Sequence, residues 1–311
     1  MRVLITGGAG FIGSALAHRL IAAGEEVVVV DDLSTGKRTN VPEQAAFIFG
    51  DLADPATLVL IPDGPYDAVV HLAAQSSGAV SQKYPYADLQ ANVGATVLLS
   101  RWCVERSVPT FVFASSMTVY GPAGPKPVTE DMPCCPISYY GVSKLASENY
   151  LRLAANEGLG VACFRFFNVY GRGQNIANLH QGMVSIYLAY LLDGVPVPVT
   201  GSLDRYRDFV HVADVVDVLT RALAKSPSGF SVYNIGTGSK TTVRELLAML
   251  IAAMKLPSDH PIEERAGSPG DVFGSVAAIS RAQQVLGWRP RVRLEDGLAD
   301  MVAWARSEKP A

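Results

Sequence analysis

The 311-residue sequence has few cysteines, no excess of basic charge and no long apolar run. Its four cysteines show no CxxC spacing and form no zinc-binding pattern with the five histidines, so we expect no metal site and a reduced, cytoplasmic protein. A net charge of −3 and an isoelectric point of about 6.0 give no basic surface for nucleic acid. No stretch reaches the ~20 apolar residues of a membrane span, and the first residues lack the apolar core and cleavage site of a signal peptide.

Apolar residues instead come in short runs separated by helical patterns. They form 49% of the chain against 18% charged residues, as expected for a compact soluble protein. Continuously apolar runs rich in β-branched residues favour buried parallel strands at 2–6, 25–31, 45–50, 66–73, 110–115 and 160–167. Helical spacing over 14–24 and 92–107 indicates crossover helices. This alternation predicts an α/β fold with a doubly wound, Rossmann-type parallel sheet.

The pattern changes after about residue 170. It predicts a long helix over 178–194, a short strand over 195–201, and a helix over 241–254 capped by Thr241 or Thr242. A strand at 231–236 would return to the sheet. We therefore expect one lobe from 1–170, rejoined by 208–236. A smaller, interleaved lobe from 171–207 and 237–311 would face the ligand crevice of the first.

A glycine-rich turn follows the first predicted strand. In LITGGAGFIG, Gly7, Gly10 and Gly13 stand directly after the strand and before a helix. Glycines there let the backbone approach a pyrophosphate at the helix N-terminus, which is the pattern of a dinucleotide site. A tight glycine turn without a ligand is the alternative.

The second predicted strand ends on a carboxylate, Asp31. At that place a carboxylate hydrogen-bonds the adenosine ribose hydroxyls and repels a 2′-phosphate, which favours NAD over NADP. Asp32 strengthens the repulsion, whereas Lys37 and Arg38 downstream keep NADP as the alternative.

A tyrosine and a lysine stand four residues apart in SYYGVSK. If this segment is helical, Tyr140 and Lys144 share one face. An ammonium group near a phenol favours the phenolate, which acts as a base near neutral pH. The alternative is a chance surface pair.

Small hydroxyl side chains end the fifth predicted strand, in FASSMTVYGP. Ser115 and Ser116 there are followed by Met117 and Thr118. These hydroxyls either terminate the strand or hold the hydroxyl of a substrate.

Together these motifs make the chain resemble the extended short-chain dehydrogenase/reductases that act on nucleotide sugars, and most of all the UDP-glucose 4-epimerases and their close relatives. The resemblance covers essentially the whole chain and is carried by TGGAGFIG, GDL, HLAA, ASSMTVYG, YYGVSK, RFFNVYG, RDFVHVADVV and LGWRP. It implies an NAD-dependent enzyme, with NAD in the larger lobe and the nucleotide sugar in the smaller one.

The resemblance also implies which residues bind the cofactor. Asp51 would contact the adenine, while Asn92 and the HLAA segment would flank the NAD. The full implied set is Gly7, Gly10, Phe11, Ile12, Gly13, Asp31, Asp51, Leu52, Leu72, Ala73, Ala74, Asn92, Tyr140 and Lys144.

For the substrate, the resemblance implies that Ser116 holds the sugar 4-hydroxyl and that Tyr140 is the base. Lys144 would bind the nicotinamide ribose and lower the pKa of Tyr140. Asn168 and Arg207 match positions that contact the nucleotide diphosphate, where a slightly acidic protein needs a guanidinium.

Nearby acidic residues offer other interpretations. A salt bridge from Arg207 to Asp204 or Asp208 is the alternative to a phosphate contact, and we expect Asp208 and Asp214 to serve turns and caps.

The residues after Ser116 select among the reactions of this family. Its 4,6-dehydratases carry an acid and a base, Asp-Glu, where this chain has Met117 and Thr118, which exchange no proton at neutral pH. We therefore expect 4-epimerisation of a UDP-hexose through a 4-keto sugar. The alternatives are another nucleotide-sugar reaction, such as 4-ketosugar reduction or dehydration, and a catalytically silent NAD-sensing protein.

Three further expectations rest on the resemblance. Ser275 falls where a bulky tyrosine restricts related epimerases to glucose and galactose, so N-acetylhexosamines should also be accepted. Ser268 replaces a phosphate-binding arginine, and Ala278 replaces a usual carboxylate. Helices at 88–105 and 139–155 would pair across a two-fold axis in a homodimer.

Overall fold

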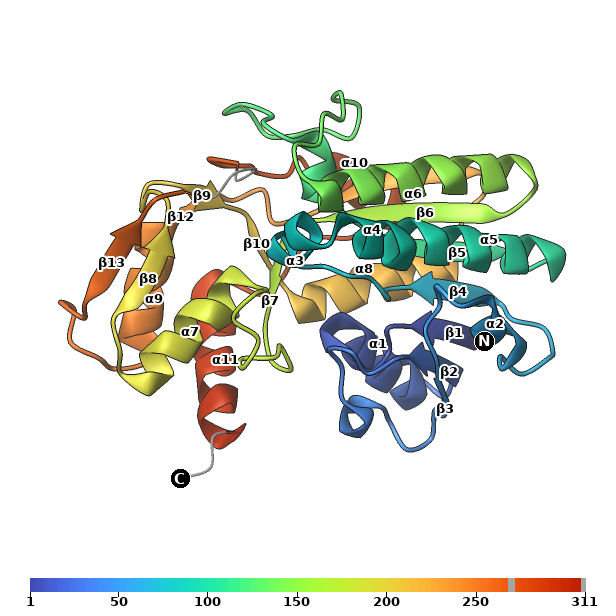
Figure 1. The fold of residues 1–311 in the computed structure, drawn as a ribbon, viewed down its shortest axis with the longest axis horizontal. Coiled ribbons are helices and arrows are strands. Elements are labelled where there is room, and N and C mark those ends of the chain that lie inside the picture. The colour runs from blue at the N-terminus through green and yellow to red at the C-terminus, as the bar shows by residue number, and fades with distance from the viewer. Residues whose placement is uncertain (268–271, 309–311) are drawn as a thin grey trace.

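The computed structural model describes residues 1–267 and 272–308, and a seven-stranded parallel sheet forms its centre (Figure 1). The strand order is β11-β6-β5-β4-β1-β2-β3. The strands are β1 (Arg2–Thr6), β2 (Glu26–Asp31), β3 (Ala46–Phe49), β4 (Ala68–His71), β5 (Thr110–Ser116), β6 (Gly160–Phe166) and β11 (Phe230–Ile235). Every neighbouring pair is parallel, so each connection crosses back over the sheet, as a doubly wound fold requires.

Burial within the sheet follows the position of each strand. The central strands β1, β4 and β6 are buried on both faces, as their continuous apolar runs predict. The expectation of a buried strand at 45–50 is wrong. β3 is the last strand of the sheet, and Phe49 at its end is 65% exposed, because an edge strand has a neighbour on one side only.

Helices cover both faces of the sheet and bury a separate core on each. On one face lie α1 (Phe11–Ala22), α8 (Val212–Lys225) and α10 (Ser280–Leu286), and on the other lie α2 (Pro55–Val59), α5 (Ala95–Glu105) and α6 (Tyr139–Asn156). Shorter helices join them: η1 (Arg38–Asn40), α3 (Gly78–Lys83), α4 (Pro85–Leu89), the π-helix η2 (Gln90–Gly94) and η3 (Met117–Tyr120). The predicted helix over 92–107 is therefore η2 continued by α5.

A second group of elements lies beside the sheet, at the left in Figure 1. It contains three two-stranded pairs, β7 with β10, β8 with β13 and β9 with β12, and three helices around an apolar core of their own. Their bounds are β7 (Asn168–Tyr170), β8 (Val197–Thr200), β9 (Tyr206–Arg207), β10 (Phe209–His211), β12 (Thr241–Thr242), β13 (Ile262–Arg265), α7 (Met183–Asp193), α9 (Val243–Ala253) and α11 (Leu294–Glu308). Between β10 and β12 the chain returns to the main sheet through β11. The exact division into two lobes stays a prediction.

The sequence predicts the start of α9 well and the start of α7 poorly. Thr242 caps α9 in a capping box with Glu245, one of the two predicted caps. The long helix predicted over 178–194 is too long. α7 begins only at Met183, because Gly182 has a φ of +86° and the residues before it form turns on the Asn178 side chain.

A buried ion pair fixes α6 to the sheet. Arg165 of β6 donates to both carboxylate oxygens of Glu148 on α6, from Nε at 2.9 Å and from Nη2 at 2.6 Å. Ser115 at the end of β5 donates to the same carboxylate at 2.5 Å. Because both charges are buried, a bidentate geometry is needed to offset their desolvation. The position of α6 relative to β5 and β6 is thereby fixed.

In the part of the chain that the structure describes, no helix is long and apolar enough to cross a membrane. Within the same residues, no group of three or more His, Cys, Asp or Glu side chains could hold a metal ion.

Candidate active site at the carboxyl edge of the sheet

The glycine turn lies where β1 and β4 end. Gly7 has a φ of +69°, and a Cβ atom on it would lie 2.6 Å from the backbone nitrogen of Ala73. A Cβ atom on Gly13 would lie 2.1 Å from the Gly7 carbonyl oxygen. Helix α1 starts immediately afterwards, and Gly10 caps it without a side chain. The first N–H groups of α1 therefore lack a side-chain cap, and an anionic group such as a pyrophosphate would suit them.

Asp31 lies beside this turn, as predicted. Its carboxylate accepts hydrogen bonds from the backbone N–H of Ala9 at 2.9 Å and of Leu33 at 2.8 Å. Burial raises the pKa of Asp31, while the two N–H donors lower it. Of the downstream basic residues, Arg38 stacks on the ring of Phe47, 4.7 Å from its centroid.

Other predicted cofactor residues surround the same edge. The segment after β4 contains Leu72, Ala73 and Ala74, and the backbone of Leu72 and Ala73 lies against Gly7. The segment after β3 contains Asp51 and Leu52. Asn92 is buried on η2, where its Nδ2 donates to Asp88 at 2.9 Å and to the carbonyl of Gln75 at 3.0 Å. Its Oδ1 has no hydrogen-bond partner among the described residues.

The structure brings Ser116, Tyr140 and Lys144 together. Ser116 is the last residue of β5, and its hydroxyl lies against that of Tyr140 in the first turn of α6. The Nζ atom of Lys144 lies 5.8 Å from the centroid of the Tyr140 ring and donates to the carbonyl of Ala114 at 2.8 Å. The helical spacing thus gives one reactive face directed at the strand end.

The electrostatics of this pair differ from the expectation. Lys144 was expected to lower the pKa of Tyr140, but burial raises that pKa to about 12, with Ser116 lowering it and Asp88 raising it. Burial also lowers the pKa of Lys144 to about 8, although the charges of Asp88 and Glu148 raise it. Without a bound cofactor, the phenol of Tyr140 is therefore protonated at neutral pH.

Asn168 and Arg207 lie on two strands of the second group of elements, β7 and β9. The side-chain amide of Asn168 donates to the carbonyl of Asp208 at 3.2 Å and contacts the Met117 sulfur at 3.7 Å. Arg207 is buried and donates to the carbonyls of Tyr206 at 2.9 Å and Phe273 at 3.2 Å. Burial, with Arg205 nearby, lowers the pKa of Arg207 to about 10.

The neighbouring carboxylates have structural partners. Asp204 pairs with Arg244 at 3.3 Å. Asp208 accepts from Thr237, Gly238 and Ala277, which joins three segments. Asp214, in the first turn of α8, accepts from the backbone of Arg291 and Val292.

Ser275 lies on an extended segment that these contacts hold. The Phe273 carbonyl accepts from Tyr206 N at 3.2 Å, and Val276 and Ala278 bond to Val128 at 2.8 Å each. Ser275 is 3% exposed, and its hydroxyl has no partner among the described residues. Ser268 lies outside the described residues.

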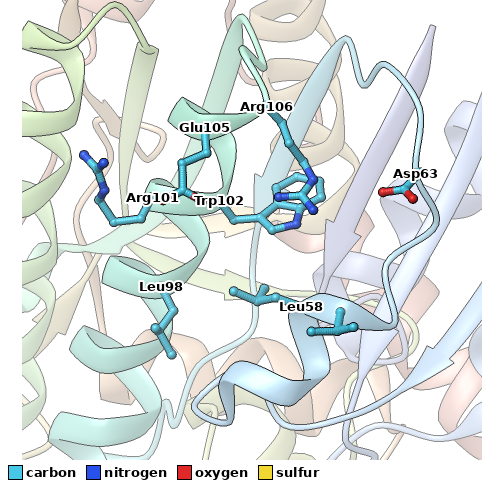
Figure 2. Close-up of a pocket in the computed structure, with 8 residues that line it drawn as sticks. Leu58, Asp63, Leu98, Arg101, Trp102, Glu105 and Arg106 are labelled. Carbon is cyan, nitrogen blue, oxygen red and sulfur yellow. The ribbon is translucent and has the colours of Figure 1, made fainter.

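A separate pocket lies away from these residues (Figure 2). It measures about 490 Å³ and is lined by residues such as Leu58, Leu98 and Trp102. Its Asp63 and Arg106 precede β4 and β5, so it lies at the amino edge of the sheet. In open α/β sheets, ligands bind outside the carboxyl edge, which is where the residues above converge.

Comparison with known proteins agrees with this geometry. A family model, the NAD dependent epimerase/dehydratase family, matches residues 3–236. The chain belongs to this family. The predicted family, fold, enzyme class and NAD cofactor are therefore confirmed.

Individual relatives match over nearly the full length. The chain is 37% identical to the UDP-glucose 4-epimerase of Mycolicibacterium smegmatis, covering 99% of each protein. The structure of the Thermotoga maritima UDP-glucose 4-epimerase with UDP-glucose superimposes with a TM-score of 0.94 at 35% identity, covering 99% of each chain. A dTDP-glucose 4,6-dehydratase from Streptomyces venezuelae, with NAD bound, gives a TM-score of 0.91 at 32% identity, covering 99% of this chain and 97% of that one.

We predict that Gly13→Ala lowers the NAD content of the purified protein and destabilises it by about 1–3 kcal/mol, because the added methyl group collides with the Gly7 carbonyl. Gly78→Ala is the control, since no atom lies within 4 Å of its added Cβ. NAD released on denaturation and urea unfolding measure the two effects. Full NAD content in Gly13→Ala would show that this turn does not hold the cofactor.

Proposed function

We propose that this protein is a UDP-hexose 4-epimerase that interconverts UDP-glucose and UDP-galactose through a transient 4-keto sugar. The observation that carries the proposal is the convergence of Ser116, Tyr140 and Lys144 beside the glycine turn, with no proton-exchanging side chain at Met117 or Thr118.

Ser116, Tyr140 and Lys144 each have a separate role in this reaction. Ser116 holds the 4-hydroxyl of the sugar, and Tyr140 removes its proton as the oxygen becomes a carbonyl. When bound, NAD would supply a reversible acceptor for the C4 hydride. Lys144 holds the nicotinamide ribose, and the hydrogen bond from Ser116 favours the phenolate of Tyr140 that burial disfavours.

The same residues argue against dehydration. Elimination of water across C5 and C6 needs a base for the C5 proton and an acid for the departing hydroxyl. The Met117 sulfur lies 3.7 Å from the Asn168 amide, and a thioether offers neither group. Thr118 hydrogen-bonds Ser116 at 3.0 Å, which supports a role for Thr118 in orienting that hydroxyl.

Return of hydride to the opposite face requires the sugar to turn while the nucleotide stays fixed. Asn168 and the buried Arg207 would hold the diphosphate, since a guanidinium matches phosphate oxygens in geometry and charge. The structural neighbour from Thermotoga maritima contains UDP-glucose, which supports UDP as the nucleotide.

We predict that Tyr140→Phe lowers kcat by about 10²–10⁴-fold and leaves NAD bound, because only the proton-transfer group is lost. The matched control is Tyr139→Phe, since Tyr139 is adjacent in sequence but 48% exposed. A coupled assay of UDP-galactose formation measures kcat. Near wild-type turnover in Tyr140→Phe would remove Tyr140 as the base.

We predict that UDP-N-acetylglucosamine and UDP-N-acetylgalactosamine are also substrates, because Ser275 occupies far less volume than tyrosine. Ser275→Tyr should lower kcat/KM for the acetylated sugars about tenfold or more relative to UDP-glucose, and Ser275→Ala should leave the ratio unchanged. If the tyrosine variant does not alter the ratio of the two kcat/KM values, Ser275 does not contact the acetamido group.

We further propose a homodimer through α4, α5 and α6. Several apolar side chains on α4 and α6 are exposed: Tyr86, Leu89, Tyr139, Val142, Tyr150 and Leu153. A self-complementary helical surface of this kind suits a two-fold interface.

Light scattering should give twice the chain mass of 33.1 kDa. Leu153→Glu should shift it toward the monomer, because Leu153 is 59% exposed on α6. Val285→Glu, on the distant α10, is the control. A monomeric wild type at micromolar concentration would contradict this proposal.

A further inference from the structure

A buried carboxylate lies beneath the candidate catalytic helix. Asp88, on α4, is only 1% exposed. Its Oδ1 accepts from Gln75 at 3.1 Å, Ser81 at 2.5 Å and Asn92 at 2.9 Å, and its Oδ2 accepts from Ser143 at 2.5 Å. No cationic nitrogen lies within 4 Å of it among residues 1–267 and 272–308. Four uncharged donors therefore replace the ion pair that a buried carboxylate usually has.

The orientation of the two amide donors is fixed by their other contacts. Asn92 Nδ2 also donates to the Gln75 carbonyl, and Gln75 Oε1 accepts from the backbone N–H of Ser77 at 2.6 Å. Both amides therefore direct N–H groups, not oxygens, at Asp88.

These contacts join the cofactor side of the site to the catalytic helix. Ser143 lies between Tyr140 and Lys144 on α6, while Asn92 lies on η2. A second bond, from Ser147 Oγ to the Asn92 carbonyl at 3.2 Å, joins the same two helices one turn further along. Asp88 therefore fixes the first turns of α6, where both reactive side chains begin.

The charge of Asp88 also acts on those side chains. It raises the pKa of Lys144 and that of Tyr140, both of which are desolvated. The other charged or titratable groups that face Lys144 are Glu148 on α6, Cys163 on β6 and His71 on β4. Glu148 forms an ion pair with Arg165, whereas Asp88 accepts hydrogen bonds from neutral donors only.

We propose that Asp88 is a positioning residue that holds α6 against η2 and supplies the negative charge that keeps Lys144 protonated during turnover. This inference rests on the proposed function. Its physical basis is the hydrogen-bond network from Asp88 to α6 and η2, together with the burial of Lys144, which lowers the pKa of that ammonium to about 8 even though the charges of Asp88 and Glu148 raise it.

Asp88→Asn keeps the size of the side chain and removes its charge. Because Asp88 raises both pKa values, its loss should lower both. Both limbs of the kcat–pH profile, which Tyr140 and Lys144 set together as a coupled pair, should therefore move to lower pH by about one unit. At the wild-type optimum, kcat should fall about tenfold with KM for the sugar nucleotide unchanged.

Two further variants separate charge from position. Asp88→Glu keeps the charge and should retain the wild-type pH profile. Ser143→Ala removes the tether from α6 but not the charge, so it should lower kcat without moving either limb. Asp88→Ser, which leaves room for a water among the same donors, provides a second uncharged variant in case the asparagine variant does not fold.

Titration of Tyr140 tests the charge effect without turnover. The difference in tyrosinate absorbance between a protein and its Tyr140→Phe variant reports the titration of Tyr140. This difference should appear at lower pH in Asp88→Asn than in the wild type. An unshifted titration and an unshifted pH profile in a folded uncharged variant would overturn the inference. If neither uncharged variant folds, an unchanged kcat in Ser143→Ala overturns it. An inactive wild type with a shifted Tyr140 titration would instead reject the proposed function and leave the role of Asp88 intact.

Discussion

The parallel register of β1, β4 and β5 is the constraint on which the rest of this structure depends. Thr6 of β1 pairs with His71 of β4, and His71 pairs with Phe113 of β5, so the three strands end at one edge. The glycine turn, the segment after β4 and the hydroxyls after β5 therefore emerge side by side. A cofactor, a proton-transfer group and a sugar can meet only because these three loops share that edge.

Buried polar contacts hold α6, the candidate catalytic helix, against this edge at two positions along its length. Glu148 binds Arg165 and Ser115 behind the reactive pair, and Asp88 binds Ser143 between its two members. Because every donor and acceptor in such a network needs a fixed partner, α6 has little freedom to slide or rotate. The positions of Tyr140 and Lys144 are thus set by side chains outside the predicted catalytic and binding residues.

The sequence allowed the fold, and the convergence of the candidate residues, to be predicted where the signal is local. Continuous apolar runs, the glycine turn and the four-residue spacing of Tyr140 and Lys144 each depend on neighbouring residues only. The exposure of β3 depends on its place at the edge of the sheet, which no short window contains. The raised pKa of Tyr140 and the partners of Asp88 come from side chains up to 55 residues apart, so spacing could not indicate them.

The central claim is that one hydride leaves C4 and returns to C4 of the same sugar. It is tested most directly by giving the purified protein UDP-glucose that carries deuterium at C4, without added cofactor, and by locating the deuterium in the product with NMR. The account predicts UDP-galactose with the deuterium retained at C4. Deuterium found at C6 of a 4-keto-6-deoxy sugar, or product formed only when a nicotinamide cofactor is added, would contradict it.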